Sequence, residues 1–122
     1  MSSDIICDFF NTWMLIQDFD SMAKLFVDNV KFTDKVDNIV YDGVSNVVNK
    51  LIYFRNKFTE NSGSMLDYNI TDSAIIMKIG FCNKQIDRIK MEFGFENGKI
   101  SSLLIDSIGS FSILQFGTGD IG

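Results

Sequence analysis

The sequence contains no histidine and no proline, and only two of its 122 residues are arginine. The absence of histidine excludes Ser-His-Asp and Cys-His catalysis, the usual zinc sites and the usual pH switch. The absence of proline excludes a cis-proline turn. A net charge of -5, with so few arginines, makes a poor surface for phosphate groups, so nucleic acid is not an expected partner.

Cysteine is also scarce. Cys7 and Cys82 lie 75 positions apart and form no CxxC motif. We expect two free, buried thiols in a reducing compartment. The first ten residues carry acids where a secretory signal carries bases. We therefore expect a cytoplasmic protein.

Long apolar runs are missing too, and the runs present are far shorter than the ~20 residues of a membrane span. A membrane is therefore not an expected partner. Hydrophobic residues nevertheless make up 46% of the chain and charged residues 22%, as in globular proteins. We expect one domain over residues 1–122. The sequence carries no metal-binding cluster, phosphate loop or nucleotide motif, so we expect no metal and no cofactor.

In the first half of the chain, apolar residues recur at three- and four-residue steps, which is typical of helices that bury one face. The pattern predicts helices near residues 3–17, 20–29 and 43–60, with short strands near 31–34 and 39–41. The three apolar faces consist of Ile6, Phe9, Phe10, Trp13 and Ile16; of Met22, Leu25 and Phe26; and of Val44, Val47, Val48, Leu51, Phe54 and Phe58.

From about residue 65 the apolar period changes to two, which is typical of strands. Alternation over residues 75–81 and 89–95 predicts two half-buried strands, and a further strand runs from Ile100 to about Ile108. Between them, Asn97-Gly98 is a specific signal for a two-residue hairpin turn. Helices followed by an antiparallel meander define an α+β protein rather than a parallel α/β fold.

Four segments in this order resemble the nuclear transport factor 2-like superfamily, which includes SnoaL-like proteins and ketosteroid isomerases. They are DFDSMAKLFVDNVKFTD, YDG before an amphipathic helix, FGFENGKI and ILQFG, within about residues 5–116. The resemblance implies a cone-shaped α+β barrel, in which three N-terminal helices pack in a curved antiparallel sheet around an apolar pocket. It also implies a homodimer formed through the outer face of the sheet.

The resemblance places Asp34 where ketosteroid isomerases keep a carboxylate general base. Such a base must move a proton between carbons inside apolar walls. The partners of that base are missing, because the isomerase's oxyanion tyrosine aligns with Phe10 and its protonated aspartate aligns near Ile89 or Met91. Neither position can donate a hydrogen bond to an enolate. Classical ketosteroid isomerase activity is therefore not expected, and the structural alternative for Asp34 is an exposed residue at a strand end.

Asp106 is the second candidate acid/base residue, because SnoaL-like cyclases carry an aspartate on a late strand. It shares a strand face with Ile100 and Leu104, from which we expect it to point inward. The favoured alternative is a strand-end aspartate that faces water. Asp87 and Arg88 resemble part of an epoxide hydrolase site, but we interpret them as a surface ion pair.

The inward faces of the first and third helices and of the central strand must meet inside a cone. Most of their side chains are ordinary core, and a subset is expected to line a cavity for a small apolar molecule. The candidate substrate-binding residues are Phe10, Trp13, Met14, Phe54, Phe58, Met91 and Phe93.

Two functions remain open at this point. The first is a pocket protein for a small apolar molecule, with Asp34 as an acid/base in an isomerase- or cyclase-type enzyme. The second is a non-catalytic homodimeric interaction or assembly module of the same fold. They differ in the depth and polarity of the cavity around Asp34.

Overall fold

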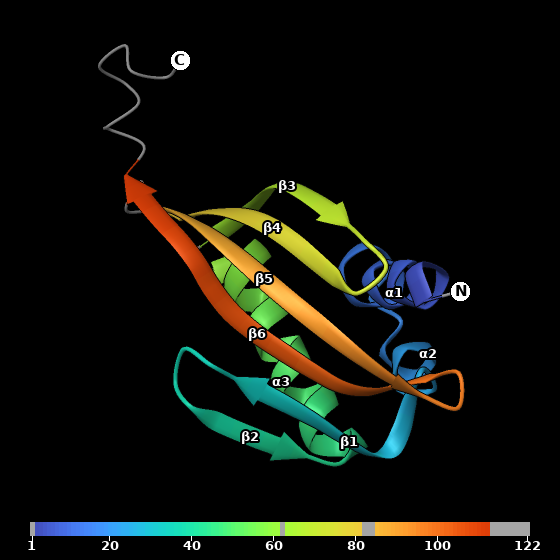
Figure 1. The fold of residues 1–122 in the computed structure, drawn as a ribbon. Coiled ribbons are helices and arrows are strands. Elements are labelled where there is room, and N and C mark those ends of the chain that lie inside the picture. The colour runs from blue at the N-terminus through green and yellow to red at the C-terminus, as the bar shows by residue number, and fades with distance from the viewer. Residues whose placement is uncertain (1, 62, 82–84, 113–122) are drawn as a thin grey trace.

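The computed structural model describes residues 2–61, 63–81 and 85–112, in which three helices gather on one face of a curved, open six-stranded sheet (Figure 1). The helices are α1 (Ser2–Phe10), α2 (Phe19–Ala23) and α3 (Val44–Asn56), and π-helical turns η1 (Asn11–Leu15) and η2 (Lys57–Asn61) follow α1 and α3. The strands are β1 (Phe26–Asp34), β2 (Ile39–Asp42), β3 (Gly63–Ile70), β4 (Ala74–Phe81), β5 (Gln85–Glu96) and β6 (Lys99–Ser112).

The sheet has the strand order β2-β1-β6-β5-β4-β3. The expected α+β architecture is confirmed, with one difference in the sheet. Strands β3 to β6 form the predicted antiparallel meander, and β1 also pairs antiparallel with β2. The pairing of β1 with β6, in contrast, is parallel. The sheet is therefore mixed rather than wholly antiparallel.

The second helix is shorter than predicted. The apolar pattern suggested a helix over residues 20–29, but the helix ends at Ala23 and β1 begins at Phe26. Phe26 and Val30 are both buried in β1, across an irregularity in its pairing with β6. A spacing of four between buried residues is typical of a helix, and here an irregular strand produces it.

The predicted hairpin turn joins β5 to β6. Asn97 and Gly98 both have positive φ, at 52° and 76°. Two successive residues of this kind define the turn whose twist matches a strand hairpin. The dipeptide therefore sets the register of the longest pairing in the sheet.

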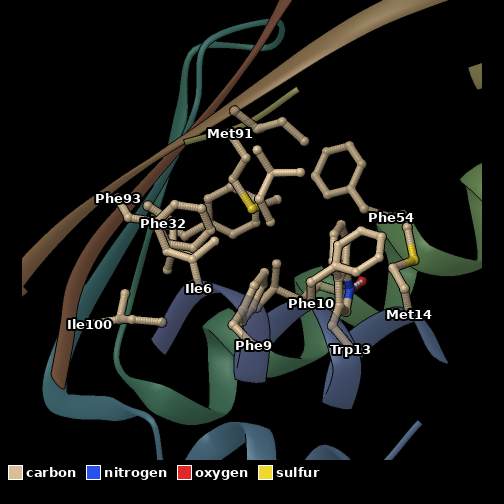
Figure 2. Packing of buried hydrophobic residues seen from close by; sticks show 14 of the residues in the cluster. Ile6, Phe9, Phe10, Trp13, Met14, Phe32, Phe54, Met91, Phe93 and Ile100 are labelled. Carbon is tan, nitrogen blue, oxygen red and sulfur yellow. Dashed lines mark hydrogen bonds between the residues drawn. The ribbon is translucent and has the colours of Figure 1, made fainter. Parts of the chain in front are cut away.

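The core lies between the helices and the concave face of the sheet, as Figure 2 shows. Phe9 is fully buried, and its ring centroid lies 5.3 Å from those of both Trp13 and Phe93. The indole Nε1 of Trp13 donates a hydrogen bond of 2.8 Å to the carbonyl oxygen of Leu51 in α3. This bond fixes the first helical segment against the third at the centre of the aromatic cluster.

The expectation of buried thiols is wrong for Cys7. Cys7 is a free thiol, but it is exposed on α1 rather than buried, because the inward face of the helix is occupied by its larger neighbours Ile6 and Phe9. Cys82 lies outside the described residues.

Among the helices in the described part of the chain, none has the length and apolar character needed to cross a membrane. The cytoplasmic location stays a prediction.

Replacing Trp13 by phenylalanine is expected to lower the free energy of unfolding by about 2 kcal/mol, because it removes a buried hydrogen bond and leaves a small void. Urea unfolding followed by circular dichroism measures this change. Tyr53→Phe is the matched control, since that ring is exposed. Equal stability of the two variants would contradict the role assigned to Trp13.

Asp18 should make stability depend on pH, because it caps α2. Hydrogen bonds from the hydroxyl and the backbone N–H of Ser21 hold the pKa of Asp18 below its ordinary value of 3.8. A lowered folded-state pKa gives a contribution that is present above the unfolded-state pKa and lost as the pH falls through the folded-state pKa. Asp18→Asn keeps a capping oxygen but cannot titrate. Urea midpoints from pH 6 to pH 2 should therefore fall less steeply in Asp18→Asn than in the wild type, and parallel profiles would exclude this linkage.

Candidate functional site

A cavity of about 220 Å³ opens where the C-terminal end of α3 meets the sheet. Strand β1 and the turn after it form one side, α3 and η2 form a second, and β5 and β6 form the floor. Its lining residues are Asp34, Val36, Asp37, Phe54, Lys57, Phe58, Asp87, Ile89, Ile105 and Ser107.

Asp34 ends β1 in the wall of this cavity, and only 1% of it is exposed. Its Oδ1 accepts hydrogen bonds from the backbone N–H groups of Val36, at 3.0 Å, and Asp37, at 3.2 Å. Aspartate favours such turns because its short side chain reaches the backbone two residues on. Its other oxygen, Oδ2, is buried and has no hydrogen-bond partner.

The register of the sheet places Asp34 beside the floor of the cavity. Asp34 pairs with Ile105 of β6, and the backbone N–H of Lys35 donates a hydrogen bond of 2.9 Å to the Ile105 carbonyl. Ile105 in turn lies opposite Met91 of β5. The parallel pairing therefore brings a carboxylate from the N-terminal half against the C-terminal meander.

The cavity combines apolar walls with an acidic rim. Phe54 and Phe58 lie one helical turn apart, with ring centroids 5.5 Å apart, and both are buried. Three of the lining side chains are carboxylates and one, Lys57, is an amine. Of the lining side chains, those of Lys57 and Ser107 can donate hydrogen bonds. The described residues contain no group of three or more side chains arranged to hold a metal ion.

The structure brings together three of the predicted site residues, namely Asp34, Phe54 and Phe58. The other predicted lining residues do not border this cavity. Phe10, Trp13, Met14 and Met91 belong to the packed core, and the Phe10 ring stacks on Tyr68 with centroids 4.3 Å apart. Phe93 packs on Phe9 and borders a separate hollow at the start of β4.

Asp106 does not lie with Asp34. Ser101 is an extra residue in β6 where the strand pairs with β5, so the alternation shifts by one position after Ile100. Leu103 and Ile105 are therefore buried on the inner face, and Asp106 lies on the outer face opposite Lys90. An unbroken alternation from Ile100 would have placed it inside.

One carboxylate of the cavity, Asp87, differs from the expected surface ion pair with Arg88. Asp87 lines the cavity, whereas its neighbour Arg88 is exposed on the other face of β5. The signal was present, because Asp87 shares the alternation of Ile89 and Met91. Asp37, Lys57 and Ser107 had no comparable signal, because each enters the lining through a turn or strand end that periodicity does not place.

No family model matches the chain, and no curated protein has significant sequence similarity to it. Solved structures do match it closely in fold. A nuclear transport factor 2-like protein of unknown function from Cytophaga hutchinsonii is 13% identical, with a TM-score of 0.60 over 88% of this chain and 89% of that one. A candidate ketosteroid isomerase from Kribbella flavida is 8% identical, with a TM-score of 0.65 over 91% of this chain and 80% of that one.

A protein with a ketosteroid isomerase-like fold from Catenulispora acidiphila, solved in complex with trimethylamine, is 9% identical. Its TM-score is 0.55 over 84% of this chain and 83% of that one. The chain therefore has the nuclear transport factor 2-like fold. Identities this low show the fold alone, and the fold hosts many unrelated activities.

Proposed function

We propose that this protein binds a small, largely apolar molecule in the cavity at the end of α3, with Asp34 as its main polar contact. The observation that carries the proposal is that Asp34, whose buried Oδ2 has no hydrogen-bond partner, lines a hollow with apolar walls and an acidic rim. A buried oxygen without a partner costs about 1–3 kcal/mol, and more when it is charged. A ligand that brings a hydrogen-bond donor to Oδ2 recovers this free energy.

The volume limits the size of the ligand. Pockets for drug-sized molecules measure roughly 300–1,000 Å³, and this cavity of about 220 Å³ is smaller. At roughly 20–30 Å³ for each non-hydrogen atom, it holds about seven to eleven such atoms. This size argues against a steroid. The trimethylamine complex of the Catenulispora acidiphila protein makes small amines reasonable first probes.

Asp34 is also the proposed acid/base group, should the ligand be a substrate for an isomerase- or cyclase-type reaction. A carboxylate at a cavity wall can take a proton from one carbon and return it to another. Stabilising the resulting enolate requires a donor at the developing oxyanion, which is worth about 2.7–4 kcal/mol. Among the lining side chains, Lys57 and Ser107 are the candidates for that donor. Asp106, on the outer face, is not placed to assist Asp34 within one cavity.

The alternative function is a homodimeric interaction or assembly module, and one observation favours it. The outer face of the sheet carries a hollow of about 370 Å³ bordered by the side chains of Ile76, Lys90 and Glu92. Lys90 and Glu92 form an ion pair of 3.0 Å on this face. Mixed apolar and charged surfaces of this kind are common in protein interfaces.

Ligand binding should be visible in the isoleucine methyl signals of the cavity. A screen of small apolar donors, such as alcohols, amides and amines, is expected to shift the methyl resonances of Ile89 and Ile105 in two-dimensional NMR spectra. The methyl signal of Ile76, on the outer face, is the internal control. Asp34→Asn should weaken the best ligand at least several-fold, and Asp106→Asn should leave it unchanged. Shifts at Ile76 alone, or none at all, would remove the pocket proposal.

Dimer formation is tested by light scattering coupled to size exclusion. A dimer through the outer face is expected to give twice the 13.8 kDa mass of the chain at micromolar concentration. Ile76→Lys places a charge in that face and should return the mass to that of one chain. Leu15→Lys, at an exposed position of η1 on the helical side of the sheet, is the control and should stay dimeric. A single-chain mass for the wild-type protein rules out this assembly under these conditions.

A further inference from the structure

We propose that the ligand of the α3 cavity is a small organic cation, an alkylammonium whose nitrogen donates its N–H to Asp34 Oδ2. This inference rests on the proposed function and adds the chemical class of the ligand. Three properties of the described site support it: the charge of the lining, the burial of Asp34 and the aromatic wall.

The charge of the lining disfavours anions and favours cations. Asp34, Asp37 and Asp87 oppose the single amine of Lys57, in a chain whose net charge is already -5. A cleft with one sign of charge and apolar walls concentrates ions of the opposite sign. A carboxylate or phosphate ligand would instead meet the unpartnered Oδ2 of Asp34.

The burial of Asp34 decides between a charged and a neutral donor. One oxygen is committed to the turn through two backbone N–H groups, and the other has no partner. A buried charge is costly unless a group of opposite charge is paired with it. An ammonium supplies both the missing donor and the compensating charge, whereas an alcohol supplies only the donor.

The aromatic wall accepts the apolar body of such a cation. Phe54 and Phe58 line the cavity, and an alkylammonium is attracted to aromatic faces as well as to carboxylates. The same stretch of α3 already shows this contact, because Lys50 Nζ lies 4.0 Å from the Tyr53 ring centroid and 5.2 Å from that of Phe54.

Four small probes, each with at least three methyl groups on one central atom, separate the contributions. Trimethylammonium carries a charge and one N–H, tetramethylammonium carries a charge without a donor, tert-butanol is a neutral donor, and pivalate is an anion. The expected order of affinity follows that sequence, with trimethylammonium at least tenfold tighter than tert-butanol and pivalate weakest. Isothermal titration and the Ile89 and Ile105 methyl shifts both measure it.

Two carboxylate variants locate the effect. Asp34→Asn keeps an oxygen for the turn, and it should weaken trimethylammonium about tenfold or more while changing tert-butanol little. Asp106→Asn removes the same charge from the opposite sheet face and should leave all four affinities unchanged. Asp37→Asn alters only an exposed rim residue, and should weaken both cations about twofold. It keeps the test valid should Asp34→Asn fail to fold.

The outcomes distinguish this inference from the proposed function. If tert-butanol binds as tightly as trimethylammonium, or if Asp34→Asn and Asp106→Asn lose cation affinity equally, the ligand is not a cation recognised by Asp34. The proposal that the cavity binds a small molecule then still holds, with a neutral ligand. If none of the four probes shifts the cavity methyls but the broader alcohol and amide screen does, the cation inference alone fails. If both sets fail, both proposals are wrong.

Discussion

The parallel pairing of β1 with β6 is the contact on which the rest of the structure depends. It joins the first strand of the chain to the last, and β6 also carries the long antiparallel pairing with β5. Without it, β1 and β2 would form an isolated two-stranded ribbon, which is marginally stable in water. With it, Asp34 lies beside Ile105, and α3 packs against β1. The core and the cavity therefore both depend on the pairing of β1 with β6.

Asp34 divides its two oxygens between structure and chemistry. Oδ1 holds the turn after β1 in place, which fixes the direction of the carboxylate. Oδ2 is left without a partner in a buried setting, which is unfavourable for the folded protein alone. Proteins tolerate such local cost most often at sites that contact a ligand. The interior close to α1 shows the opposite arrangement, because Trp13 has its hydrogen bond to Leu51 and aromatic rings fill the space around it.

Sequence patterns predicted the parts of this fold that depend on local periodicity. The three helices, the meander and the Asn97-Gly98 turn follow from neighbouring residues. The parallel pair could not be predicted in this way, since it joins segments about seventy residues apart. The outward position of Asp106 depends on one extra residue, Ser101, which the apolar periodicity does not predict. Asp34 came from the resemblance to a known superfamily, and Asp87 could have come from its alternation with Ile89.

The separation between the aromatic core and the cavity mouth affects how such a protein can diverge. Four of the ten lining residues, namely Val36, Asp37, Lys57 and Ser107, are exposed and make little contribution to the packed interior. Substitutions at these positions can reshape or recharge the mouth while the packing around Trp13 is untouched, because distant sites contribute additively to stability. New ligand preferences can therefore accumulate by single substitutions without an unstable intermediate, which makes the mouth a suitable region for directed evolution.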